Sequence, residues 1–194
     1  AHVASEFRQN EPVIDSRALH FAVSQSGETA DTLAAVKHIQ ENDAKIRGVI
    51  NVVGSSIARQ CGHGVYIHSG PEQAVASTKA FTNMVAALNL FALEIGRSRN
   101  LPRVSGRSMV KALRALPDQV ESIIHSSTSY DEAVEAVKDA KSVLFLGRGF
   151  SAPVAREGAL KLMEIAYIPC LAYPAGEMKH GPIALLEDGS PVVV

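Results

Sequence analysis

Apolar residues along this chain follow two alternating patterns. Short runs rich in valine, isoleucine and phenylalanine are typical of strands buried in a parallel sheet. Longer stretches with apolar residues at every third or fourth position predict helices. The short runs predict strands over residues 17–23, 48–53, 64–67, 142–146 and 170–173, and from 191 onward. The longer stretches predict helices over residues 30–41, 55–60, 79–95 and 153–167. This alternation predicts an α/β fold with a doubly wound parallel sheet.

Residues 100–140 break this alternation. They mix arginine and lysine with apolar residues and contain no strand pattern, so we expect a helical connector. Pro117 is expected to begin its second helix and residues 130–138 to form its third. A strand, a loop of small residues and a helix follow one another twice in the chain, at Ser24 and at Gly147. We therefore expect a first domain over 1–99, the connector over 100–140, and the start of a second, similar domain over 141–194.

The last residues read as a strand that is cut short. Pro191-Val192-Val193-Val194 has the pattern of a buried strand but no crossover after it. We therefore expect the sequence to be a piece of a longer protein, truncated at both ends.

Composition narrows the classes of partner. The 194 residues carry a formal net charge of −1 and are 46% hydrophobic, which suffices for a buried core. Near-neutral charge without an evident basic cluster argues against nucleic acid, and no apolar run is long enough to cross a membrane. Cys61 and Cys170 lack CxxC spacing, which suits a reducing, cytoplasmic location. Cys61 and His63 have no second pair at ligand spacing, so we expect no metal site, and we expect no cofactor.

Three hydroxyl residues, Ser24, Ser26 and Thr29, lie between the first strand and its helix. Helix N-termini carry unpaired N–H groups and a partial positive charge, so they bind anions. The hydroxyls add donors, and Gly27 allows close approach of the backbone. The alternative is a plain helix cap, but a cap needs only one hydroxyl. We interpret the loop as a phosphate cradle, in which Glu28 must point away from the anion.

A second group of polar residues lies on the helix after Gly149. Glu157, Lys161 and Glu164 are spaced so that they share one face of a mostly apolar helix, which we expect to be largely buried. Charges on such a helix are costly unless they are paired or used. The alternative is an exposed Glu157–Lys161 ion pair, and spacing alone leaves both interpretations open.

Two further segments have polar residues in a defined setting. The octet Ala175-Gly176-Glu177-Met178-Lys179-His180-Gly181-Pro182 is expected to form a loop that opens a short apolar helix. Taken alone, His180 would be interpreted as a structural or merely exposed histidine. The segment Val75-Ala76-Ser77-Thr78-Lys79 precedes the longest helix, which Ser77 or Thr78 is expected to cap and Gly96 to end.

These four segments resemble, in the same order, those of sugar-isomerase (SIS) domains. In particular they resemble the isomerase half of the glucosamine-6-phosphate synthases, also called glutamine–fructose-6-phosphate aminotransferases. The shared motifs are Ser24-Gln25-Ser26-Gly27-Glu28-Thr29, Val75-Ala76-Ser77-Thr78-Lys79, Glu157-Gly158-Ala159-Leu160-Lys161 with Glu164, and the octet 175–182. Met163 and Ala166 depart from the polar residues that family members often carry there. We interpret these two as packing changes.

The resemblance implies a flavodoxin-like, three-layer αβα fold and an enzyme of hexosamine biosynthesis, the route to UDP-N-acetylglucosamine. Such an enzyme adds ammonia to fructose 6-phosphate and moves a proton between C1 and C2 to make glucosamine 6-phosphate. Glu164 would be the general base, Lys161 would lie beside the reacting carbons, and His180 would help to open the sugar ring. The substrate-binding residues would be Ser24, Gln25, Ser26, Thr29, Val75 and Ser77.

The resemblance also implies partners that this sequence does not contain. A glutaminase domain of the same full-length chain would supply ammonia, and His180 would act across a homodimer. The family's Gly-Thr-Ser loop, the rest of its second domain and its C-terminal lysine are absent from the 194 residues. Two alternatives stay open: a glutaminase-free SIS enzyme, such as a deglycase or aminosugar-phosphate isomerase, and a non-catalytic module that senses sugar phosphates. A sensor would need the cradle but not a base.

Overall fold

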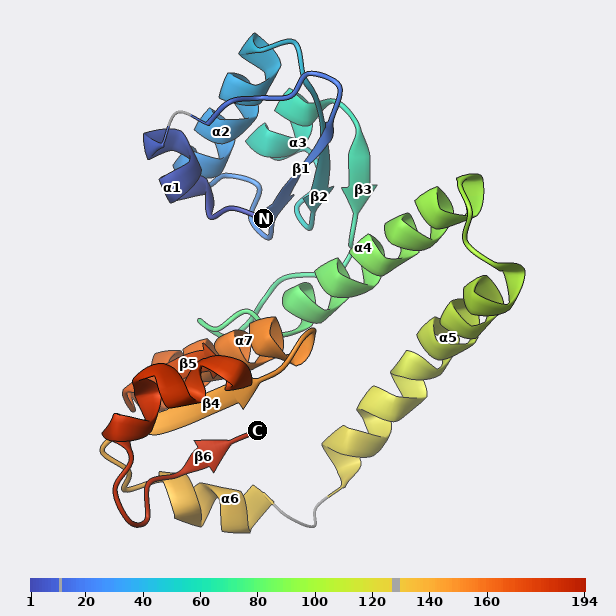
Figure 1. The fold of residues 1–194 in the computed structure, drawn as a ribbon. Helices are drawn as coiled ribbons and strands as arrows, with labels where there is room; N and C mark the ends of the chain where they lie inside the picture. The colour runs from blue at the N-terminus through green and yellow to red at the C-terminus, as the bar shows by residue number, and fades with distance from the viewer. Residues whose placement is uncertain (11, 127–129) are drawn as a thin grey trace. The chain divides into compact units, whose positions relative to one another are not determined.

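The chain folds into two compact units, each with its own sheet (Figure 1). A computed structural model describes residues 1–10, 12–126 and 130–194. The first unit comprises residues 1–73 and 77–114, and the second comprises residues 74–76 and 115–194. The predicted domain limits at 99 and 140 stay a prediction, because the units divide inside a helix.

The first unit is built on three parallel strands in the order β1-β2-β3. Strands β1 and β2 pair in register from Leu19 opposite Lys45 to Ser24 opposite Ile50. The elements are α1 (Ala4–Gln9), β1 (Leu19–Ser24), α2 (Ala30–Glu41), β2 (Lys45–Ile50), α3 (Ser56–Cys61), β3 (Gly64–Tyr66) and α4 (Lys79–Ser98). Parallel strands need a crossover between them, and α2 and α3 provide these crossovers.

Helices cover both faces of this sheet because side chains alternate along β1. Ala22 joins the core that Val36 of α2 and Ile57 of α3 complete. Phe21 points to the other face and contacts Phe91 of α4, with ring centroids 4.6 Å apart. The α/β fold with helices on both faces of a parallel sheet is therefore confirmed.

The second unit has a parallel sheet in the order β5-β4-β6. Val143 and Phe145 of β4 pack on Ala159 of α7 to form its core. Its elements are the end of α5 (Arg103–His125), α6 (Tyr130–Val137), β4 (Val143–Gly147), α7 (Ser151–Ala166), β5 (Cys170–Pro174), the 3₁₀ helices η1 (Ala175–His180) and η2 (Pro182–Leu185), and β6 (Val192–Val193). In the part of the chain that the structure describes, no helix is long and apolar enough to span a membrane.

Four predictions about individual elements are wrong. Helix α5 runs through Pro117 rather than starting there, although proline removes one backbone hydrogen bond. Helix α4 passes Gly96 and ends at Ser98; Leu101 folds back onto Gly96, whose missing side chain makes room for this contact. Helix α7 is not largely buried, since Ala159 is its one buried residue among those described. Strand β6 is exposed. Helix α1 was not predicted, because six residues show too little periodicity.

The loop after β1 depends on a glycine that packs directly on another loop. Gly27 has φ +67°, a conformation that favours glycine, and it faces the residue before α3. A Cβ at this position would collide with the Ser55 hydroxyl, lie 2.5 Å from the Ser55 Cβ and lie 3.0 Å from a methyl carbon of Ile50. No larger residue fits, so glycine fixes the path of the loop.

Gly27→Ala should destabilise the protein more than Gly54→Ala. Gly54 has φ +71° but open space around it, so alanine there carries only the backbone penalty of about 1 kcal/mol. At Gly27 the collision with Ser55 should add roughly 1–3 kcal/mol. Urea denaturation of both variants measures the difference. Equal losses would show that Gly27 is not held by this contact.

Candidate functional site

Two of the predicted loop hydroxyls accept hydrogen bonds from the loop itself. The Gly27 amide donates to Ser24 Oγ at 3.0 Å, and the Glu28 amide donates to Ser26 Oγ at 3.2 Å. Thr29 is the N-cap residue of α2, but its side chain makes no capping hydrogen bond. None of these three hydroxyls therefore serves as a plain cap of α2.

This arrangement leaves the hydroxyls able to donate. An oxygen that accepts an N–H bond keeps its own O–H for another acceptor, and hydroxyl hydrogens rotate to suit. The amide of Glu28 is already paired with Ser26 Oγ and is therefore not available to a ligand. The site therefore offers an anion three O–H donors at the start of the 12-residue helix α2.

A cavity of about 560 Å³ opens beside this loop in the first unit. It lies at the carboxyl ends of β1 and β2, where ligands bind in parallel α/β sheets. Its lining residues are Gln25, Asn51, Val52, His68, Gly70, Pro71 and Glu72. Gln25, a predicted substrate-binding residue, is thus brought to the cavity.

Asn51 is a polar residue of this site that the sequence analysis missed. Its side chain is buried; Oδ1 accepts from the Ser69 amide and Nδ2 donates to the Gly70 carbonyl, both at 2.8 Å. The amide therefore holds the loop after β3 against the end of β2. An asparagine directly after the apolar run Gly48–Ile50 was the available signal.

Glu72 is the second missed residue, and it performs the capping that we expected of Ser77 or Thr78. Thr78 holds the N-cap position of α4 without a side-chain cap. The Glu72 carboxylate instead accepts from the Ala80 amide at 2.7 Å, and from the amide and hydroxyl of Thr78 at 3.4 Å. The hydrogen bond from the Ala80 amide is the largest cause that holds the pKa of Glu72 below its usual range.

Glu157, Lys161 and Glu164 of α7 form a network of ion pairs. Lys161 Nζ lies 2.7 Å from Glu164 Oε2 and 3.3 Å from Glu157 Oε1. The side chains are 21%, 33% and 24% exposed, respectively, so the pairs are largely shielded. Burial alone would lower the pKa of Lys161, but hydrogen bonds and charges of the two glutamates outweigh it and raise that pKa. Lysine therefore stays charged beside both carboxylates.

The other predicted residues are not drawn into this network. His180 ends η1 and is exposed; it makes no hydrogen bond or ion pair with Lys161 or Glu164 in the described part of the chain. Val75 is 96% exposed and Ser77 is half-buried. The loop after β1 belongs to the first unit and α7 to the second, and the structure defines each unit separately.

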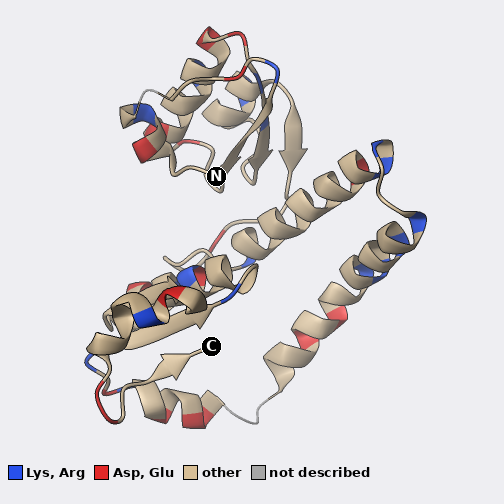
Figure 2. Cartoon of the chain, in the orientation of Figure 1, with Lys and Arg blue, Asp and Glu red and all other residues tan. Residues whose placement is uncertain are grey.

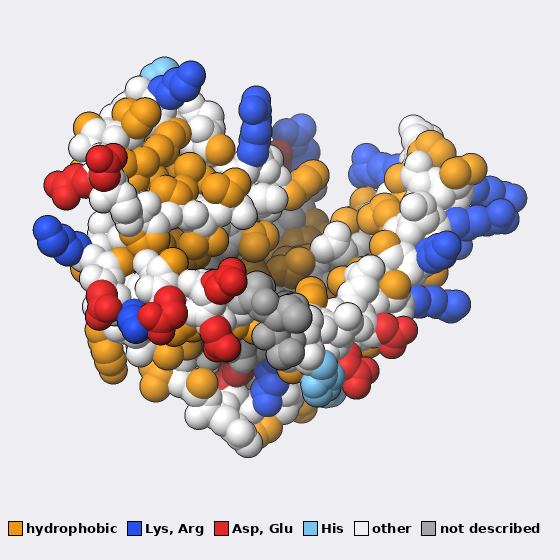
Figure 3. All heavy atoms as spheres, turned by 90° about the horizontal axis from the view of Figure 1, so that it is seen from below, with side chains coloured by type: hydrophobic (Ala, Val, Ile, Leu, Met, Phe, Trp, Pro, Cys, Tyr) orange, Lys and Arg blue, Asp and Glu red, His pale blue; other side chains and the backbone are white. Residues whose placement is uncertain are grey.

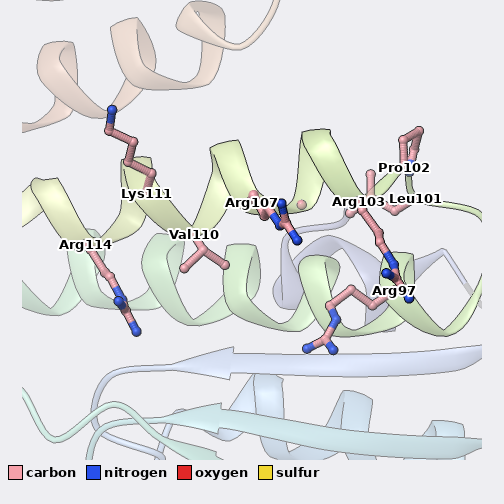
Figure 4. A pocket seen from close by; sticks show the side chains of 9 residues that line it. Arg97, Leu101, Pro102, Arg103, Arg107, Val110, Lys111 and Arg114 are labelled. Atoms are coloured by element: carbon pink, nitrogen blue, oxygen red, sulfur yellow. The ribbon is translucent and has the colours of Figure 1, made fainter.

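A larger groove, of about 750 Å³, lies between α4 and α5 and is basic. Arg97 from α4 and Arg103 and Arg107 from α5 line it (Figure 4). Five arginines and one lysine lie between residues 95 and 117, without an acidic residue, and Figure 2 shows basic residues at the turn between the helices and along the first half of α5. In Figure 3 basic side chains follow the first half of α5 and acidic ones its second half. The expectation of no basic cluster is therefore wrong.

This groove does not offer acid–base chemistry. Arginine keeps its proton at all accessible pH values, so it cannot act as a base near neutrality. Among residues 1–10, 12–126 and 130–194, no group of three or more metal-binding side chains is present. Burial raises the pKa of the Cys61 thiol, which disfavours the thiolate that metals bind. The residues that line the groove include no carboxylate or histidine that could exchange a proton near neutrality.

The sequence profile of the SIS domain family matches residues 1–94 and 136–194, most of the chain. The chain belongs to the SIS domain family. Two curated relatives are named glutamine–fructose-6-phosphate aminotransferase [isomerizing]. The one from Thermus thermophilus is 49% identical and covers 99% of this chain, and the one from Chlorobaculum tepidum is 47% identical and covers 98%. The SIS chain spans about a third of their length, 32% and 31% respectively.

A solved structure supports the same family assignment. The C-terminal domain of glucosamine-fructose-6-phosphate aminotransferase from Francisella tularensis superposes with a TM-score of 0.94 at 38% sequence identity. The match covers 98% of this SIS chain and 55% of that chain. The resemblance inferred from four short motifs is thus confirmed over nearly all of the chain.

Removal of the Glu72 carboxylate should loosen the first turn of α4. In Glu72→Ala the Ala80 amide loses its acceptor and should exchange with solvent faster, whereas Glu72→Gln should preserve part of the protection. In the unaltered protein the contact should be complete above the ordinary glutamate pKa. Since the folded pKa is lowered, it should be lost only as the pH falls through that lower value. Hydrogen exchange by NMR measures both effects; unchanged Ala80 protection in Glu72→Ala would contradict them.

Proposed function

We propose that this chain is the sugar-phosphate isomerase part of a glutamine–fructose-6-phosphate aminotransferase. The observation that carries the proposal is the largely shielded Lys161–Glu164 pair, 2.7 Å apart on α7, in a chain 49% identical to an enzyme of that name. A carboxylate beside an ammonium is suited to proton transfer at carbon, because the cation stabilises negative charge that develops on the substrate. A sensing module has no need of such a pair.

The phosphate of the sugar would bind in the loop after β1. Ser24, Ser26 and Thr29 present three hydroxyl donors there, and Gln25 lines the adjoining cavity. Charge-assisted hydrogen bonds of this type contribute about 1.5–3 kcal/mol each. Asn51 and Glu72 would then shape the cavity wall that faces the sugar.

Glu164 would act on the carbon atoms of the open-chain sugar. Ammonia adds to the C2 ketone of fructose 6-phosphate, water leaves, and an imine forms. Glu164 then removes a proton from C1 while the imine nitrogen gains one, which gives an enolamine; the proton returns to C2 as the C1 hydroxyl loses its own, which yields the amino aldose, glucosamine 6-phosphate. Lys161 would stay protonated through both steps, in keeping with its raised pKa.

The remaining roles rest on the resemblance alone. His180 as the ring-opening group, Val75 and Ser77 as sugar contacts, and ammonia from a glutaminase domain stay predictions. So do the homodimer and the cytoplasmic location. The exposed position of His180 on η1 is compatible with action on a ligand, since nothing within its own helix engages it.

Glu164→Gln should reduce isomerisation about a hundredfold or more, because the amide preserves shape but cannot accept the proton. Glu157→Gln is the matched control: it removes the other carboxylate that pairs with Lys161 and should change the rate less than about threefold. Both variants should be made in the full-length protein. Exchange of solvent hydrogen into C1 or C2 of the sugar, at the unaltered rate in Glu164→Gln, would exclude Glu164 as the base.

A further inference from the structure

The loop after β1 is fastened to the start of α3 by two hydrogen bonds and one packing contact. The Ser56 amide donates to Glu28 Oε1 at 2.8 Å, and the Ile57 amide donates to the Gly27 carbonyl at 2.9 Å. Ser55, which is buried, packs on Gly27 between them. Two of the amides that a helix start leaves unpaired are thus used to hold a neighbouring loop.

The charge of Glu28 lies within this attachment. A free carboxylate one residue from Thr29 would repel a bound phosphate, so an acidic residue in an anion site needs an explanation. Here Ser56 is the largest cause of the lowered pKa of Glu28, through its side chain and then its backbone amide, and the charge of Arg59 adds to it. Arg59 in turn donates to Ser56 Oγ at 3.1 Å and to the Gly54 carbonyl.

We propose that Glu28 is a positioning residue of the anion site: its carboxylate fastens the loop 24–29 to α3, so that Ser26 and Thr29 face the ligand. This inference rests on the proposed function, because it takes the loop as the phosphate site. Glu28 does not touch the ligand. It acts through the Ser56 amide, and its negative charge is engaged there instead of facing the phosphate.

When Glu28 is replaced, the positioning role and simple electrostatics predict opposite changes in the affinity for phosphate. If Glu28 were only a negative charge near the site, its removal would relieve repulsion and tighten the binding of phosphate. If Glu28 positions the loop, Glu28→Ala should weaken binding despite the lost repulsion, because the hydroxyls are no longer held in place. Glu28→Gln retains an oxygen that can accept from the Ser56 amide, so it should restore most of the affinity.

The experiment is calorimetric titration of fructose 6-phosphate into the full-length protein and three variants. We expect Glu28→Ala to weaken binding about fivefold, a modest loss for one exposed hydrogen bond, and Glu28→Gln to stay within about twofold of the unaltered protein. Glu41→Ala is the control, because it removes an exposed carboxylate at the far end of α2 and should leave affinity unchanged. Hydrogen exchange should accelerate at the Ser56 and Ile57 amides in Glu28→Ala alone.

Two results would overturn the positioning role. One is unchanged or tighter binding in Glu28→Ala; the other is weaker binding with no change in exchange at Ser56 and Ile57. If the unaltered protein binds no fructose 6-phosphate, the proposed function fails. The exchange measurement then still decides whether Glu28 holds the loop on α3, so the two failures are distinguishable.

Discussion

The contact between Gly27 and Ser55 is the constraint on which the candidate phosphate site depends. A parallel sheet gathers the ends of its strands at one edge, so the loops after β1 and β2 must share a small space. Glycine with φ +67° lets the first loop lie directly on the second, with no room for a side chain. The loop hydroxyls therefore have fixed positions before any ligand arrives, which reduces the entropy that binding must overcome.

Carboxylates from outside the helices satisfy two helix starts in this unit. Glu28 accepts from the first residue of α3, and Glu72 accepts from the start of α4. In both places a nearby serine or threonine could have served as the cap but does not. Thr29, the N-cap residue of α2, makes no side-chain capping hydrogen bond, so its hydroxyl remains available to a ligand. Carboxylate caps at α3 and α4 and an unused hydroxyl at α2 link the local structure of the loops to the proposed function.

The sequence predicted the strands and helices well where hydrophobic periodicity was strong, as in α2, whose bounds agree with the prediction. It failed at Gly96 and Pro117, because glycine and proline predict helix boundaries that the structure does not have there. Gly96 is covered by Leu101, a contact that exists only in the folded chain, and Pro117 lies within a continuous helix although it removes one backbone hydrogen bond. It also failed for the burial of α7, because an apolar composition does not say which neighbours cover a helix.

Site residues within one motif were predictable, whereas those that act through distant contacts were not. The shared face of Glu157, Lys161 and Glu164 follows from helical spacing, but spacing left open whether Lys161 and Glu157 form a merely exposed pair, and the structure shows the pairs largely shielded. Asn51 and Glu72 could not be found in this way, since their partners lie 6 to 19 residues along the chain and the contacts exist only in the folded loops. Likewise, an overall charge of −1 concealed the basic groove, because charge sums carry no information about position.

The most direct test of this account is the affinity of the full-length protein for fructose 6-phosphate compared with fructose, each measured with and without Ser26→Ala. The account predicts binding of fructose 6-phosphate, much weaker binding of fructose, and a loss of roughly tenfold for the phosphorylated sugar in the variant. Fructose should be insensitive to the substitution, because Ser26 is assigned to the phosphate alone. Equal affinity for fructose 6-phosphate in the presence and absence of the Ser26 hydroxyl would contradict the account.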